Sequence, residues 1–85
     1  MSDKPLLEFP ARYPLKVMGR GEEDFEALVL EIVNRHVPGD LDVRTRPSRD
    51  GNFLAVTVVF EAQSKAQLDA LYMELTDHER VLMAL

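Results

Sequence analysis

The sequence predicts an α+β domain whose elements follow the order βαββαβ. The strongest observation is the turn signal Asp50-Gly51-Asn52, which precedes the strongest β-forming run of the chain, residues 53–60. The other two observations are stretches with apolar residues at helical spacing, residues 25–33 and 68–75, one on each side of this hairpin. Right-handed crossovers then place both helices on one face of a four-stranded antiparallel sheet with strand order 4-1-3-2, the ferredoxin-like sandwich.

The chain is predicted to divide into an N-terminal extended segment, residues 1–12, and a single domain, residues 13–85. Pro5 and Pro10 disfavour a helix in the segment. The segment also contains apolar side chains at Leu6, Leu7 and Phe9. We expect these side chains either to lie across the domain, partly covering its open sheet face, or to dock onto a partner.

The first strand and the first helix are predicted from the spacing of their apolar residues. Residues 13–19 largely alternate between apolar and polar side chains, which is typical of a half-buried strand. Residues 25–33 then carry apolar side chains at helical spacing, after acidic residues 22–24 that suit a helix N-terminus. Pro38-Gly39 ends this helix.

Residues 41–49 and 52–62 are predicted to be the two strands of the hairpin. A two-residue type I′ turn requires positive φ at both central positions, which glycine adopts freely and aspartate tolerates. With Asp50-Gly51 at the corner, Val43 lies opposite Val58 and the register of the hairpin is fixed. Because strand side chains alternate between two faces, one face of the hairpin is predicted to be core. The side chains of that face are Val43, Thr45, Leu54, Val56, Val58 and Phe60.

The second helix and the fourth strand complete the predicted fold. Ser64 and Gln67 match the capping box, with serine at the N-cap and glutamine at the third helical position. The helix continues through residues 68–75 and gives way near Asp77. The short apolar run 80–85 is the fourth strand. In this topology the first and third strands are central, and the sheet face opposite the helices is uncovered.

Length and composition exclude several classes of protein. Eighty-five residues suffice for one domain, which buries roughly 60% of its unfolded surface. The chain has no cysteine, which excludes thiolate metal sites and cysteine nucleophiles. No stretch approaches the roughly 18 apolar residues of a membrane helix, and the start of the chain is unlike a signal peptide. We therefore expect a soluble, cytoplasmic protein with no membrane partner.

The net charge of −5 is unevenly distributed along the chain. The predicted helical stretches, residues 22–36 and 61–80, carry most of the acidic side chains, whereas residues 1–21 and 41–52 are net positive. The basic stretches coincide with predicted strands. We therefore expect a dipolar molecule with acidic helices and a basic sheet.

Few residues suggest catalysis or metal binding. His36 and His78 are the only histidines, and each lies near the end of a predicted helix, where a cation would cap the C-terminus. The acidic residues 22–24 are expected to be a solvated helix start. Neither Ser48 nor Ser64 has a histidine–aspartate pair nearby in sequence, and Ser64 is accounted for as a cap. We predict no catalytic, cofactor-binding or metal-binding residue.

Two less favoured functions are enzymatic activity and RNA binding. Gly19-Arg20-Gly21 lies between a strand and a helix, where free backbone amides can bind an anion, although the acids that follow oppose one. An acylphosphatase-like enzyme of this fold would place an arginine there, and Arg20 would be its candidate. RNA-recognition modules stack bases on aromatic residues of the central strands. The predicted open face has no aromatic residue in its middle and only Phe53 at the edge beside the turn, so nucleic-acid binding is disfavoured.

The uncovered face of the sheet is the predicted interaction surface. It combines apolar side chains with cations, more than a merely solvated sheet face requires. Its predicted residues are Lys16, Met18, Arg44, Arg46, Ala55, Thr57 and Val59, and Leu82 and Ala84 extend the apolar part. We expect a protein partner, self-association through this face or along a sheet edge, or a small anionic effector such as a carboxylate or an amino acid. The favoured function is a non-enzymatic regulatory or protein-interaction module.

Several motifs also resemble those of one family. They are Leu6-Leu-Glu-Phe-Pro10, Lys16-Val-Met-Gly19, Arg35-His36 with Pro38-Gly-Asp40, and Pro47-Ser48 with Gly51-Asn-Phe53. In this order and spacing, over nearly the whole chain, they resemble the YbeD-like family of small bacterial proteins, sometimes described as lipoate regulatory proteins. The resemblance implies a βαββαβ fold similar to ACT-type regulatory domains, which bind small effectors such as amino acids, and a link to lipoate metabolism. It implies no catalytic residue.

Overall fold

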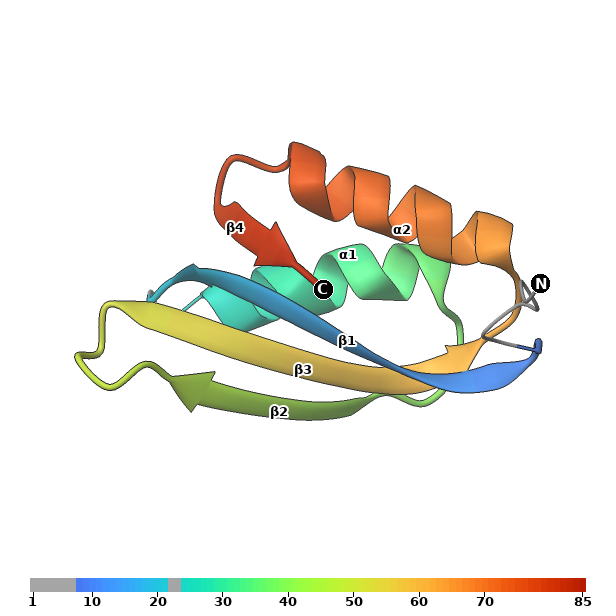
Figure 1. The fold of residues 1–85 in the computed structure, drawn as a ribbon, viewed down its shortest axis with the longest axis horizontal. Helices are drawn as coiled ribbons and strands as arrows, with labels where there is room; N and C mark the ends of the chain where they lie inside the picture. The colour runs from blue at the N-terminus through green and yellow to red at the C-terminus, as the bar shows by residue number, and fades with distance from the viewer. Residues whose placement is uncertain (1–7, 22–23) are drawn as a thin grey trace, which may run out of the picture.

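The computed structural model describes residues 8–21 and 24–85, and in this part of the chain the predicted elements form in the predicted order. They are β1 (Ala11–Arg20), α1 (Phe25–His36), β2 (Asp42–Pro47), β3 (Phe53–Ala62), α2 (Lys65–Asp77) and β4 (Val81–Ala84). The strands form one antiparallel sheet in the order β2-β3-β1-β4. Figure 1 shows both helices, running in opposite directions, on one side of this sheet. The predicted ferredoxin-like topology is confirmed.

The first strand is longer than predicted. It begins at Ala11 instead of Tyr13, and it pairs with β3 along the whole length of both strands. Phe9, just before the strand, packs against the core on the helix side of the sheet. The expected cover of the open face by Leu6 and Leu7 concerns residues outside the described part of the chain.

The hairpin between β2 and β3 has the predicted register but a different turn. Among the described residues only glycines have positive φ, and Gly51 is one of them, with φ of 79°. The N–H of Gly51 donates a hydrogen bond of 3.0 Å to the C=O of Ser48, so Arg49 and Asp50 are the central residues of the turn. The predicted two-residue corner at Asp50-Gly51 is therefore wrong. The longer loop has the same centre, which is why the strand register is unchanged.

The side chain of Asp50 organises this loop. Its Oδ1 accepts hydrogen bonds from the Ser48 hydroxyl at 2.8 Å and from the N–H of Asn52 at 3.0 Å. The Ser48 hydroxyl in turn accepts one from the N–H of Phe53 at 3.1 Å. The bond from the Asn52 N–H, followed by the bond from Ser48, lowers the pKa of the Asp50 carboxyl. Asp50 thus stabilises the turn through the hydrogen bonds of its side chain and not by adopting positive φ.

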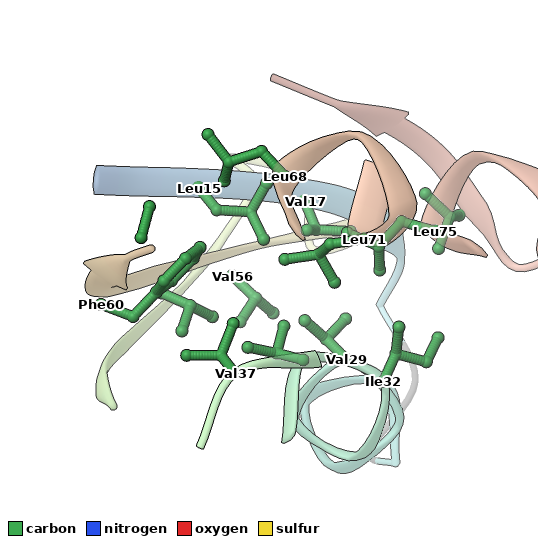
Figure 2. Close-up of a cluster of buried hydrophobic side chains, with 14 of the residues drawn as sticks. Leu15, Val17, Val29, Ile32, Val37, Val56, Phe60, Leu68, Leu71 and Leu75 are labelled. Atoms are coloured by element: carbon green, nitrogen blue, oxygen red, sulfur yellow. The ribbon is translucent and has the colours of Figure 1, made fainter. Parts of the chain in front are cut away.

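The core lies between the sheet and the two helices. Val56, Val58 and Phe60 of β3 are fully buried, as predicted. Figure 2 shows Val56 and Phe60 in one cluster with Leu15 of β1 and with apolar side chains from both helices. No side-chain polar atom is buried without a hydrogen-bond partner in the described part of the chain.

The edge strand β2 contributes less to the core than predicted. Val43 of β2 and Leu54, which lies opposite Pro47, are half-buried against the core. Thr45 is exposed although it has the core parity. The helices pack over β1, β3 and β4. No helix covers Thr45, and its prediction as a core residue is wrong.

Gly19 is required by the close approach of α1 to β1. A Cβ at this position would lie 2.3 Å from the ring of Phe25 and 2.7 Å from the C=O of Arg80. Phe25 is the first residue of α1, and its side chain is fully buried. The absence of a side chain at Gly19 therefore lets the start of the helix seal one end of the core.

One pair of helix ends is joined by Gln67. The hydroxyl of Ser64 accepts a hydrogen bond from the N–H of Gln67 at 3.1 Å, which confirms the predicted N-cap of α2. The glutamine side chain departs from the predicted capping box, because its Oε1 accepts from the N–H of Gln63 at 2.8 Å. Its Nε2 donates to the C=O of His36 at 2.9 Å and so satisfies a carbonyl at the end of α1.

The other pair of helix ends is joined by Asp24 and Arg80. The guanidinium of Arg80 donates to both carboxylate oxygens of Asp24, at 2.7 and 3.0 Å. These bonds lower the pKa of the Asp24 carboxyl. Asp24 is paired, but its side chain stays 72% exposed, in agreement with the predicted solvated helix start. Glu22 and Glu23 lie outside the described residues.

Gly51→Val should lower the free energy of unfolding by about 1–3 kcal/mol, because a β-branched residue is strained at positive φ. Gly51→Asn is the matched control, since asparagine tolerates this conformation and no atom lies within 4 Å of an added Cβ. Denaturant titration of both variants measures the difference. A valine variant as stable as the asparagine variant would show that the loop does not need this conformation.

Phe60→Ala should lower the free energy of unfolding by about 3–5 kcal/mol, because the ring is fully buried and its removal leaves a cavity. Thr57→Ala should cost less than about 1 kcal/mol, since this side chain points to the open face of the same strand. Chemical denaturation followed by circular dichroism compares them. The reverse order would mean that β3 is turned over.

Candidate functional site

The open face of the sheet, opposite the helices, is formed by alternate residues of the four strands. Two rows of directly paired residues cross its middle. In the first row, Arg44 of β2, Thr57 of β3 and Lys16 of β1 lie side by side. Backbone hydrogen bonds of 2.8 and 3.2 Å add Leu85 next to Lys16. The second row consists of Arg46, Ala55, Met18 and Met83.

Strand pairing thus brings the predicted interaction residues to one face. Six of them occupy the two rows, and Val59 lies on β3 just beyond, opposite Pro14 of β1 and Asp42 of β2. In Figure 1 this face is the side of the sheet away from α1 and α2. None of the described elements covers it.

Three cations of this face, Lys16, Arg44 and Arg46, form what we call the cation cluster. All three side chains are exposed, and none has a hydrogen bond or ion pair with a described residue. Asp42, the nearest acid along β2, faces Arg12 instead, at 3.8 Å. The cation cluster therefore presents unneutralised charge on a chain whose net charge is −5.

A hollow lies within the cation cluster. Its volume is about 440 Å³, and its lining residues are Lys16, Arg44, Thr45, Arg46, Ala55 and Thr57. The side chains in its centre, Ala55 and Thr57, are small, whereas the cations around it are long. The hollow therefore has room for a carboxylate group and carries the charge to attract one, since Lys and Arg bind carboxylates through charge-assisted hydrogen bonds.

Apolar side chains occupy the β1 and β4 side of the same face. Met18 and Met83 lie opposite each other, and Leu85 follows in the next row. Met83 is 49% exposed and Leu85 is 61% exposed. These three residues are called the apolar strip below.

The structure corrects the predicted apolar extension of this face at Ala84, whereas Leu82 is exposed at a register shift. The register of β4 shifts between its pairs with Met18 and Gly19, and Leu82 is the residue left without a partner. Ala84 lies opposite Val17 and packs against the core. Residues 80–85 are almost uniformly apolar, so the sequence has no alternation from which the exposed residues Leu82, Met83 and Leu85 could have been identified.

The open face does not have the aromatic platform of an RNA-recognition module. Phe53 is the only aromatic residue with open-face parity among the described strand residues. It lies at the start of β3 opposite Arg20, away from the middle of the sheet. The arrangement therefore gives no support to base stacking on the central strands.

The loop after β1 is less suited to anion binding than its sequence suggests. The N–H of Gly21 donates a hydrogen bond of 2.8 Å to the C=O of Asn52, so it is not free for a ligand. Arg20 is exposed at the end of β1 and lines a shallow hollow with Glu79, Arg80 and Leu82. An acid and a salt-bridged arginine thus surround the candidate residue of an acylphosphatase-like site.

The two histidines lie near the predicted helix ends, and their side chains make different hydrogen bonds. The Nε2 of His36 lies 2.6 Å from Oε1 of Glu74, whose other oxygen pairs with Arg35. His78 is the C-cap of α2, and its Nδ1 accepts a hydrogen bond from the N–H of Arg80 at 3.2 Å. Glu74, on α2, therefore links the helices, and the hydrogen bond from Arg35, followed by that from His36, lowers its pKa.

No group of three or more potential metal ligands from His, Cys, Asp and Glu occurs within residues 8–21 and 24–85. A helix long and apolar enough to cross a membrane is likewise not found in this part of the chain.

Comparison with known sequences gives full-length matches. A profile of the family described as "Protein of unknown function (DUF493)" matches residues 4–85. A UPF0250 protein of Chromobacterium violaceum is 44% identical, and the alignment covers 100% of this chain and 100% of that protein. A UPF0250 protein from Ectopseudomonas mendocina is 48% identical, and the alignment covers 95% of this chain and 91% of that protein. These matches confirm the resemblance to the YbeD-like family.

Comparison with solved structures supports the fold. Protein HP0495 from Helicobacter pylori aligns with a TM-score of 0.75 and 18% identity, over 99% of this chain and 90% of its own. The C-terminal domain of the MgtC protein from Mycobacterium tuberculosis aligns with a TM-score of 0.67 and 20% identity, over 94% and 89%. At these identities the similarity concerns the fold alone.

Glu74→Gln should make the thermal midpoint less sensitive to acid. The pKa of Glu74 is lowered in the folded protein, so its contacts stabilise the fold above the ordinary glutamate pKa of about 4.3. This stabilisation is lost as the pH falls through the lowered pKa. The midpoint of the wild type should therefore drop more than that of the variant between about pH 7 and about pH 3.

The control for this prediction is Glu31→Gln, which removes an exposed carboxylate 3.4 Å from the same arginine, Arg35. It should leave the pH dependence close to that of the wild type. If Glu74→Gln behaves like the control, the contacts of Glu74 do not serve stability, and the cluster would need another explanation.

Proposed function

Because the chain belongs to the family of proteins of unknown function DUF493, whose description assigns no activity, we propose its function from the open face. We propose that it is a non-enzymatic regulatory module that binds an acidic partner protein through the cation cluster. The observation that carries this proposal is the absence of any described partner for Lys16, Arg44 and Arg46. Charges of one sign gathered on an exposed face attract groups of the opposite sign and increase the rate of association.

The rest of the molecule supports a directional approach. Exposed acids such as Glu31, Asp69 and Asp77 lie on the two helices, on the other side of the sheet. An acidic partner is therefore repelled by the helix layer and attracted by the open face. Like-charge repulsion of this kind suppresses wrong orientations more than it adds affinity.

A small carboxylate effector is the second candidate function, and the hollow of about 440 Å³ favours it. The Thr57 hydroxyl lies in the row between Lys16 and Arg44 and could accept or donate a hydrogen bond there. Amino acids, as ligands of ACT-type domains, and lipoate, from the link that the family resemblance implies, are the carboxylates to test first.

Self-association through the open faces is less favoured. A two-fold axis would place the same surface of each copy against the other. Where that axis brings the two cation clusters together, like charges in the interface destabilise it. A dimer of this kind would need an anion between its halves.

Arg44→Glu combined with Arg46→Glu should abolish capture of the acidic partner from an extract of the native cell. Both side chains are exposed, so the free energy of unfolding should change by less than about 0.5 kcal/mol. Affinity capture followed by mass spectrometry identifies the retained proteins. To test for an effector, the same extract is passed over the immobilised wild type and the bound metabolites are identified.

The matched control is Arg49→Glu combined with Lys65→Glu, which makes the same change in net charge on exposed residues of the β2–β3 loop and the start of α2. The control should retain the partner. Equal yields of the same proteins from wild type and from the open-face variant would place the interaction elsewhere and sink the proposal.

A further inference from the structure

We infer that the partner segment is an amphipathic α-helix with an apolar stripe and an acidic flank, lying along the middle of the open face. This inference rests on the proposed function and adds the form of the partner to it. It follows from the position of the cation cluster relative to the apolar strip, and from the small residues between them.

The two zones lie side by side across the sheet. Arg44 and Arg46 belong to β2 at one edge, whereas Met83 and Leu85 belong to β4 and the residue after it at the other edge. Each cation of β2 shares a row with an apolar residue at the β4 edge. The rows run Arg44, Thr57, Lys16, Leu85 and Arg46, Ala55, Met18, Met83.

The width of this surface selects the form of the occupant. Neighbouring strands lie about 4.8 Å apart, so β2 and β4 are separated by about 14 Å. An α-helix with its side chains is about 10–12 Å wide and can contact both zones at once. An extended segment is about as wide as one strand and would not span from Arg44 and Arg46 on β2 to Met83 on β4. A lone carboxylate would reach only the cation cluster.

The middle of the face allows a helix to approach closely. Ala55 and Thr57, on β3 between the zones, have small side chains, and the hollow lies over them. Long side chains stand on both sides of it. The thioethers of Met18 and Met83 can adapt to an apolar stripe, and the guanidinium groups of Arg44 and Arg46 can hold carboxylates along one flank.

A second copy of this chain fits the surface poorly. The exposed part of α2 does carry Met73, which is 70% exposed, beside Asp69 and Asp77. Docking this helix on the open face of another copy is a head-to-tail contact between different surfaces. Such contacts generate rings or open filaments and not a closed pair.

The test uses a synthetic helical peptide of about 18 residues, long enough to be partly helical when free. Leucines at helical spacing form its stripe, and glutamates form one flank. Two matched peptides accompany it: one with glutamine in place of every glutamate, and one with two central prolines that break the helix. Binding to the full-length chain is measured by isothermal titration calorimetry and by NMR chemical-shift changes.

The protein variants address each zone with its own control. Met83→Ser removes an apolar group from the strip, and its control is Met73→Ser, an exposed methionine on the helix layer. Arg44→Glu with Arg46→Glu changes the cation cluster, and its control is Arg49→Glu with Lys65→Glu. Each open-face change should weaken binding of the acidic helical peptide by about tenfold or more. The controls should weaken it less than about twofold.

The outcomes separate this inference from the proposed function. If the glutamine and proline peptides bind weakly and both open-face variants lose affinity, the inference is supported. If the proline peptide binds as well as the helical one and Met83→Ser has no effect, the helix is overturned while recognition of acidic groups stands. If charge reversal at Arg44 and Arg46 leaves binding unchanged, both fail.

Two further results would overturn the helix inference. The first is no binding of the acidic helical peptide to the wild type at millimolar concentration. The second is a wild-type dimer in sedimentation equilibrium that dissociates on Met83→Ser, because the open face would then be covered by a second copy.

Discussion

The pairing of β3 with β1 is the constraint on which the rest of the structure depends. The two strands pair over their entire length, from Ala11 opposite Ala62 to Arg20 opposite Phe53. This pairing fixes which side chains of both central strands face the helices, and β2 and β4 take their orientation from it. A shift of one residue would exchange the buried and the open faces. The apolar core and the charged surface are therefore two consequences of one register.

The ends of the helices explain why the second layer stays on one side. Gln67 joins the start of α2 to the end of α1, and Arg80 joins the end of α2 to Asp24. Gly19 lets the ring of Phe25 reach the sheet. With both ends fixed, each helix has its buried stripe on the sheet and its acids in solvent. The same contacts keep the acids of the helices away from the cations of the open face.

Much of this could be predicted from the sequence because local signals and topology agree. The β-run after Gly51 and the cap at Ser64 are strong signals, and strand alternation then assigns Lys16, Arg44 and Arg46 to one face. Two features could not be predicted. The turn uses the carboxylate of Asp50, a side-chain solution that its sequence does not distinguish from a two-residue corner. The register shift at Leu82 occurs in a run of apolar residues, where no alternation reveals which side chains are exposed.

Stability alone does not account for the cation cluster. Oppositely charged residues directly across a strand pair contribute roughly 0.2–1 kcal/mol, so an acid opposite Arg44 or Arg46 would have helped the fold. The positions opposite are instead Thr57 and Ala55. Elsewhere the chain pairs some of its exposed cations, as Lys65 with Asp69 and Arg12 with Asp42 show, although Arg20 and Arg49 have no ion pair with a described residue. Acids are thus available and are used on the helices and at one end of the sheet, while the middle of the open face has none. The proposed acidic helix would supply both the carboxylates that this surface lacks and a cover for the apolar side chains that it exposes to water.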